Sequence, residues 1–142
     1  MNTNIFAKLS LTTLLAIAPA FGESAITAKI PFDFTVNRTK MTAGNYTVRF
    51  DIPGAMSIYR DDRKAVCIAL TTAVQANTPQ PAKLVFNRYG DSYFLSQVWG
   101  PGADRGRQLP KSKPELEVAR TINRVQRASV PVTSHDPVDS SR

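Results

Sequence analysis

The feature that most constrains the fold is a two-residue turn, Gly90-Asp91, between two runs rich in apolar and aromatic residues. The runs cover residues 83–89 and 92–99. A glycine at the first central position suits a two-residue type II′ hairpin turn, because that position needs a positive φ. The sequence therefore predicts an antiparallel hairpin over residues 83–99.

The turn also determines which side chains share a face of the hairpin. Its register predicts three cross-strand pairs: Arg88 with Tyr93, Phe86 with Leu95, and Leu84 with Gln97. One face would then carry Leu84, Phe86, Leu95 and Trp99, and the other would carry Val85, Tyr89, Phe94 and Val98. Strands that are apolar on both faces must be covered on both. We therefore expect this hairpin to be central, between the sheet core and a second covering element such as a helix.

Other segments show the periodicity of strands. Every even position from 26 to 36 is apolar, which is the alternation of a half-buried strand. Pro31 removes one backbone donor, so we expect this strand either to lie at an edge or to bend at residue 31 into two. Further strands are predicted over 46–52, 56–59 and 65–74, with turns or loops at 37–40, 61–64 and 76–81.

These segments together predict a mainly β fold. We expect a small antiparallel barrel or sandwich of about six to eight strands, with one C-terminal helix packed on it. Residues 107–110 would add a short edge strand after the Gly/Pro-rich loop 100–106. A chain of 142 residues fits one domain, which we place at residues 23–127.

The helix is predicted over about residues 113–127. Ser112 and Glu115 form an S-x-x-E capping box, and Pro114 lies in the first turn, where proline is tolerated. Three apolar residues at i, i+4 and i+7 are expected to pack on the sheet: Val118, Ile122 and Val125. The polar face would carry Arg120, Arg124 and Arg127. Residues 128–142 lack periodicity and are predicted to form a disordered tail.

Residues 1–22 have the pattern of a secretory signal peptide. Lys8 is their only charge, residues 9–18 are almost all apolar or small, and Ala20-Phe21-Gly22 places small residues at a cleavage site. An apolar run of about 10 to 13 residues is too short for a membrane span, so no integral membrane insertion is expected after cleavage. The mature chain is expected to be periplasmic or extracellular, where nucleic acid is not an expected partner.

The chain offers little catalytic chemistry. Its single cysteine and single histidine exclude a disulfide framework and a Cys/His metal cluster. Cys67 lies in an apolar run and is predicted to be an inert, buried thiol, while His135 falls in the predicted tail. No catalytic residue, metal or cofactor is therefore predicted. Four acids leave open a carboxylate-dependent hydrolase: Asp33, Asp51, Asp91 and Asp104.

Two groups of residues are candidates for binding. The first lies on the central hairpin and combines arginine with aromatic rings, as ligand platforms do: Arg88, Tyr89, Tyr93, Gln97 and Trp99. The alternative interpretation of this group is structural, with Arg88 stacked on Tyr93 as a cross-strand pair. The second group, the basic segment, consists of Arg105, Arg107, Lys111 and Lys113. It would bind an anionic envelope polymer, or it would only keep the chain soluble and shield an edge strand.

Five segments together resemble a known family. Their sequences are PFDFTVN (31–37), AGNYTV (43–48), FNRYG (86–90), YFLSQVW (93–99) and LPKS (109–112). They are similar to small signal-bearing exported proteins of acidobacteria, and the resemblance covers roughly residues 5–125. It implies an exported bacterial protein. Because that family has no assigned activity, the resemblance transfers no catalytic residue.

The sequence therefore predicts an exported, non-catalytic binding or envelope-associated module rather than an enzyme. The expected partner is an anionic envelope polymer or another envelope protein. Two alternatives remain open. One is a small barrel that carries an apolar ligand in an internal cavity, and the other is the carboxylate-dependent hydrolase.

Overall fold

The structure is a computed structural model that describes residues 25–50, 52–60 and 65–135. The predicted signal peptide, Asp51, the 61–64 loop and residues 136–142 lie outside these described residues. The described part of the chain forms strands and one helix. The elements are β1 (Ala25–Ile30), β2 (Phe34–Val36), β3 (Thr39–Met41), β4 (Gly44–Arg49), β5 (Ala55–Arg60), β6 (Ala65–Leu70), β7 (Thr72–Gln80), β8 (Lys83–Tyr89), β9 (Ser92–Trp99), β10 (Ala103–Gln108), α1 (Lys113–Thr121), β11 (Gln126–Pro131) and β12 (Thr133–His135).

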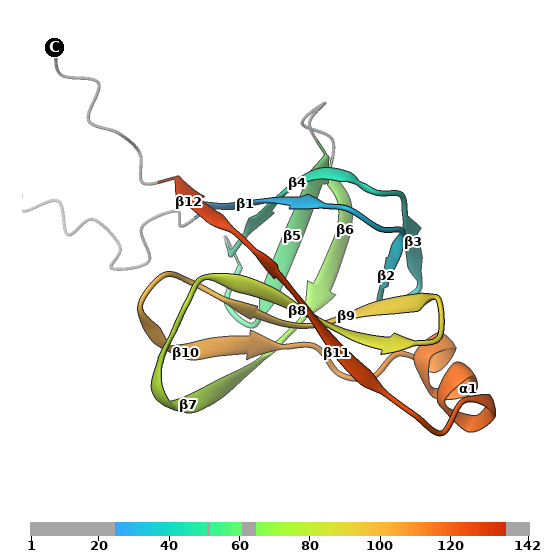
Figure 1. Cartoon of the computed structure of the whole chain (residues 1–142). Helices are drawn as coiled ribbons and strands as arrows, with labels where there is room; N and C mark the ends of the chain where they lie inside the picture. The colour runs from blue at the N-terminus through green and yellow to red at the C-terminus, as the bar shows by residue number, and fades with distance from the viewer. Residues whose placement is uncertain (1–24, 51, 61–64, 136–142) are drawn as a thin grey trace, which may run out of the picture.

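The strands form two sheets that pack against each other (Figure 1). Sheet A has the order β12-β1-β4-β5-β6, and sheet B has the order β11-β8-β9-β10-β7. The short β2 pairs with β3 and also reaches β9 through Thr35 and Phe94. The predicted mainly β fold with one helix is confirmed, and its form is a sandwich rather than a closed barrel.

Two segments pass from one sheet into the other. β6 at the end of sheet A continues into β7 at the end of sheet B, with Thr71 between them. β11 of sheet B continues into β12 of sheet A across Val132. The backbone N–H of Thr71 donates to the Gly54 carbonyl at 2.8 Å, and that of Val132 to the Ala82 carbonyl at 3.2 Å. These two corners connect the sheets at both edges.

The first predicted strand bends at its proline. β1 ends at Ile30, and β2 begins at Phe34 after an exposed Pro31. β1 lies between β12 and β4 over Ala25 to Thr27, so the bend, and not an edge position, accommodates the proline. The even-numbered residues of β1 point into the core, as the alternation predicted: Ile26, Ala28 and Ile30.

Two segments of sheet B, at β7 and β10, differ from the sequence-based expectation. Residues 76–81 are not a loop up to Pro81, because β7 extends to Gln80 and contains Pro79. β7 is the last strand of sheet B, and an edge strand tolerates a residue without an N–H donor. Of the predicted short edge strand 107–110, only residues 107 and 108 are in a strand: they end β10, which begins at Ala103 within the predicted loop 100–106 and pairs with β9 on one side and β7 on the other.

The central hairpin has the predicted turn but one changed face. Tyr89 pairs with Ser92 across Gly90-Asp91, and only Gly90 of the two has a positive φ, which fits type II′. The pairs of Arg88 with Tyr93 and of Phe86 with Leu95 are confirmed. Beyond them a β-bulge shifts the register, so Leu84 pairs with Val98 and Val85 with Gln97. The extra residue moves Val98 to the core face and Trp99 to the opposite one.

The C-terminal part of the chain also differs from the prediction. α1 ends at Thr121 rather than at residue 127, and residues 126–135 form β11 and β12 rather than a disordered tail. Ala128 and Val130 of β11 face the core, so this segment has the two-residue period of a strand. His135, expected in the tail, lies in β12 opposite Ala25.

The core lies between the two sheets. Its largest fully buried side chains come from both: Tyr46, Met56 and Ile58 of sheet A, and Leu84 and Phe86 of sheet B. Aromatic rings extend the cluster toward the β8–β9 turn, where Phe32 meets Phe86 edge to face at 4.9 Å between ring centroids. Within the described residues, no helix is long and apolar enough to cross a membrane.

Candidate functional site

One half of the outer face of sheet B is covered by α1. We call outer the face of this sheet that is directed away from sheet A; it carries Asn87, Tyr89 and Phe94 near the hairpin turn. α1 lies at this end of the sheet (Figure 1). The helix was expected to dock through its apolar residues, but Ile122 and Val125 are 37% and 51% exposed and Val118 is only half-buried. That prediction is wrong.

The helix docks instead through a carboxylate. Glu115 is 3% exposed, and its Oε1 accepts hydrogen bonds from Asn87 Nδ2 at 2.8 Å and from the Tyr89 hydroxyl at 3.1 Å. Ser112 is the predicted N-cap and accepts from the backbone N–H of Glu115 at 3.4 Å. The Glu115 side chain does not complete the capping box, because it is directed into the sheet. Burial above all, and then the Glu115 carboxylate, raise the pKa of Tyr89.

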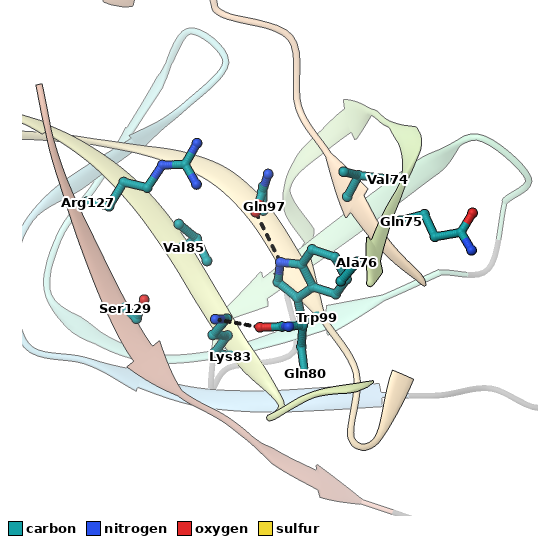
Figure 2. Close-up of a pocket in the computed structure, with 10 residues that line it drawn as sticks. All are labelled: Val74, Gln75, Ala76, Gln80, Lys83, Val85, Gln97, Trp99, Arg127 and Ser129. Carbon is teal, nitrogen blue, oxygen red and sulfur yellow. Dashed lines mark hydrogen bonds between the residues drawn. The ribbon is translucent and has the colours of Figure 1, made fainter. Parts of the chain in front are cut away.

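The other half of the same face forms an open pocket of about 310 Å³. Figure 2 shows Arg127 and Ser129 of β11 on one side and Val74 and Gln75 of β7 on the other. Between them lie the remaining lining residues, which come from β7, β8 and β9: Ala76, Gln80, Lys83, Val85, Gln97 and Trp99. The pocket therefore exists because four strands bring distant parts of the chain side by side.

Trp99 forms the floor of this pocket. The indole lies over Gly106 of β10, where an added Cβ would stand only 2.7 Å from the ring atom Cδ2. The ring Nε1–H donates to Gln97 Oε1 at 3.1 Å, which fixes the orientation of the indole in its plane (Figure 2). Trp99 and Val85 are each 5% exposed, so they form a buried apolar base and not an open aromatic platform.

The rim of the pocket is polar and positively charged. Lys83 Nζ donates to Gln80 Oε1 at 3.2 Å, and Arg127 and Ser129 are exposed. No hydrogen bond or ion pair joins the Arg127 guanidinium to another residue of the described part of the chain. None of the described residues that line the pocket is acidic. The rim thus presents two cations together with amide and hydroxyl groups.

The five candidate residues of the hairpin separate into three environments. Arg88 stacks on Tyr93 at 5.3 Å and donates through Nε to the Gly90 carbonyl at 2.7 Å, while Tyr93 stacks on Phe32 at 3.8 Å. The predicted stacking of Arg88 on Tyr93 is therefore confirmed. Tyr89 lies beneath α1. Of the five, Gln97 and Trp99 line the pocket.

The basic segment does not contribute to the pocket. Gly106 faces the Trp99 ring, so its neighbours Arg105 and Arg107 lie on the opposite face of β10. Lys111 and Lys113 are exposed on either side of the N-cap of α1. The cations that do line the pocket, Lys83 and Arg127, were not among the predicted binding residues.

The remaining candidates for chemistry have structural environments. Cys67 is half-buried with its Sγ 3.9 Å from the Val36 carbonyl, and burial raises the pKa of its thiol more than a hydrogen bond with Thr39 lowers it. Asp33 accepts a hydrogen bond from the Ala43 backbone at 2.9 Å. Asp91 lies in the hairpin turn. Among the residues that the structure describes, no group of three or more His, Cys, Asp or Glu could hold a metal ion.

Comparisons with protein-family models, with curated proteins and with solved structures found no significant match to the chain. The geometry of the pocket is therefore the basis for any functional conclusion.

Proposed function

We propose that the protein is an exported, non-catalytic binding module, and that its ligand site is the pocket on the outer face of sheet B. The observation that carries this proposal is a concave site in which polar and charged side chains converge around an apolar base, a combination that ligand sites share. Export is supported by the signal pattern of residues 1–22. The partner is a component of the bacterial envelope.

Two observations favour this function over the alternatives. The space between the sheets is occupied by large side chains such as Tyr46, Met56 and Phe86, which are at most 1% exposed, so an apolar ligand carried inside the fold is less well supported. A carboxylate-dependent hydrolase needs two acids facing one cleft. Asp33 is engaged with the backbone of Ala43, and the described lining of the pocket contains no acid.

The proposal can be tested through the fluorescence of Trp99, which is the single tryptophan of the chain. We expect a saturable change in its emission when the purified chain is titrated with a soluble acidobacterial envelope extract. The Gly106→Ala variant should lose this response, because the new methyl group would displace the indole from its position over β10.

Gly100→Ala is the matched control for this experiment, since an added Cβ there meets nothing within 4 Å. It should respond like the parent chain. Equal titration curves for all three chains, with far-UV circular dichroism showing them folded, would mean that the pocket is not the binding site.

A further inference from the structure

We infer that the pocket binds an acidic saccharide, that is, a segment of a glycan that carries uronic-acid carboxylates. This inference rests on the proposed function and names the chemical class of its ligand. Three features of the pocket carry it: the exposed Arg127 guanidinium, the polar groups on the rim, and the small apolar base.

The charges on the rim indicate an anionic ligand. The exposed Arg127 guanidinium has no ion-pair or hydrogen-bond partner in the described part of the chain, and its planar fork of donors matches the two oxygens of a carboxylate. The Lys83 ammonium group donates one hydrogen bond to Gln80 Oε1, and its two other protons can be donated to a ligand. The described lining has no acidic side chain to repel a carboxylate.

The uncharged groups indicate a ligand rich in hydroxyl groups. The amide of Gln97 and the hydroxyl of Ser129 each offer both a donor and an acceptor to the pocket. A sugar hydroxyl also donates and accepts, so it can pair with either group. Sulfate, by contrast, only accepts hydrogen bonds and would leave the acceptors of these side chains unused.

The base of the pocket fits one edge of a sugar ring. Val85 and Trp99 provide a small apolar surface at the bottom, against which the C–H groups of a sugar can pack. The volume of about 310 Å³ is at the lower end for ligand sites, and exposed residues such as Ser129 and Arg127 leave its rim open. An open, shallow site of this kind suits a short segment of a longer chain.

Titration of the full chain with trigalacturonate in 0.15 M salt, followed by Trp99 emission, tests the inference. We expect saturable binding, and binding weakened at least about tenfold for the methyl ester, which has the same sugars without the charges. Arg127→Gln and Lys83→Gln should each weaken binding of the acid by about tenfold and leave binding of the ester unchanged. Arg120→Gln, an equal change of net charge on the exposed side of α1, is the control and should bind like the parent.

The outcomes separate this inference from the proposed function. Equal affinity for the acid and its ester would overturn the role of charge, and equal competition by pyrophosphate would overturn the role of the sugar. If neither sugar binds while the envelope extract still changes Trp99 emission in a Gly106-dependent way, the ligand class is wrong and the binding module stands. If no probe changes the emission, both the inference and the proposed function fail.

Discussion

At the scale of single residues, the Glu115 carboxylate holds α1 on sheet B. Removing a carboxylate from water is costly, and the hydrogen bonds from Asn87 and Tyr89 offset part of that cost. The contact is therefore specific: it determines where the helix lies, which the exposed Ile122 and Val125 do not.

Replacing Glu115 by alanine should lower the free energy of unfolding by about 2 to 3 kcal/mol, because two buried donors lose their acceptor. Urea denaturation measures this change. Glu117→Ala, an exposed neighbour on the same helix, should change stability by less than about 0.5 kcal/mol. Similar values for the two variants would show that Glu115 does not anchor the helix.

The raised pKa of Tyr89 makes stability depend on alkaline pH. An unfolded tyrosine ionises near pH 10, whereas burial and the Glu115 carboxylate keep the folded Tyr89 protonated to higher pH. The unfolded state then binds fewer protons, so the contribution of Tyr89 is complete below about pH 10 and is lost as the pH rises toward the folded pKa.

Denaturation curves between pH 9 and 11 should therefore show stability falling with pH, with a Tyr89 contribution of at most ~1.4 kcal/mol per pH unit. Tyr89→Phe should fall less steeply over the same range. A slope equal to that of the parent would contradict this environment for the hydroxyl.

At the scale of elements, local signals predicted the hairpin well and the C-terminal segment poorly. Gly90-Asp91 determines its turn within two residues, so no distant contact was needed to predict it. The bulge opposite Val85 and Phe86 has no equally local signal, and it moved Trp99 to the outer face. In residues 126–131, arginine and serine alternate with two small apolar side chains, Ala128 and Val130, a pattern too weak to indicate a strand without its partner β8.

The contrast between β11 and the end of α1 gives a direct test at this scale. Val130→Asp should lower stability by several kcal/mol, roughly 3 to 5, because Val130 is 6% exposed in the core and the new charge would be unpaired. Val125→Asp should change it by less than about 0.5 kcal/mol, since that side chain is 51% exposed. Thermal melts with the opposite order would support a docked long helix and a loose tail.

At the scale of the whole molecule, the outer face of sheet B, which is directed away from sheet A, carries two features. α1 covers the part near the hairpin turn, and the pocket occupies the rest. Gln97 and Trp99 could be predicted as site residues because they lie on one strand near an arginine and aromatic rings. Lys83 and Arg127 could not, since their proximity depends on β8 and β11 being neighbours and sequence had placed Arg127 on the helix.

The same scale explains why the basic segment did not indicate the pocket. Four cations close together in sequence suggested one surface, but strand alternation and the N-cap of α1 distribute them over different faces. The pocket has fewer cations, and they come from strands that are distant in the chain. Charge clustering in the sequence therefore did not indicate the cations of the pocket.

The central claim is that a ligand binds the outer face of sheet B over Trp99, and the indole N–H resonance tests it most directly. The chain has one tryptophan, so a ¹⁵N-labelled sample gives one indole peak, from the group that donates to Gln97. On addition of the envelope extract, we expect that peak to shift together with the backbone amides of Val85 and Ser129, while the amides of α1 stay in place. Shifts confined to α1 or to sheet A, with an unmoved indole peak, would contradict the account.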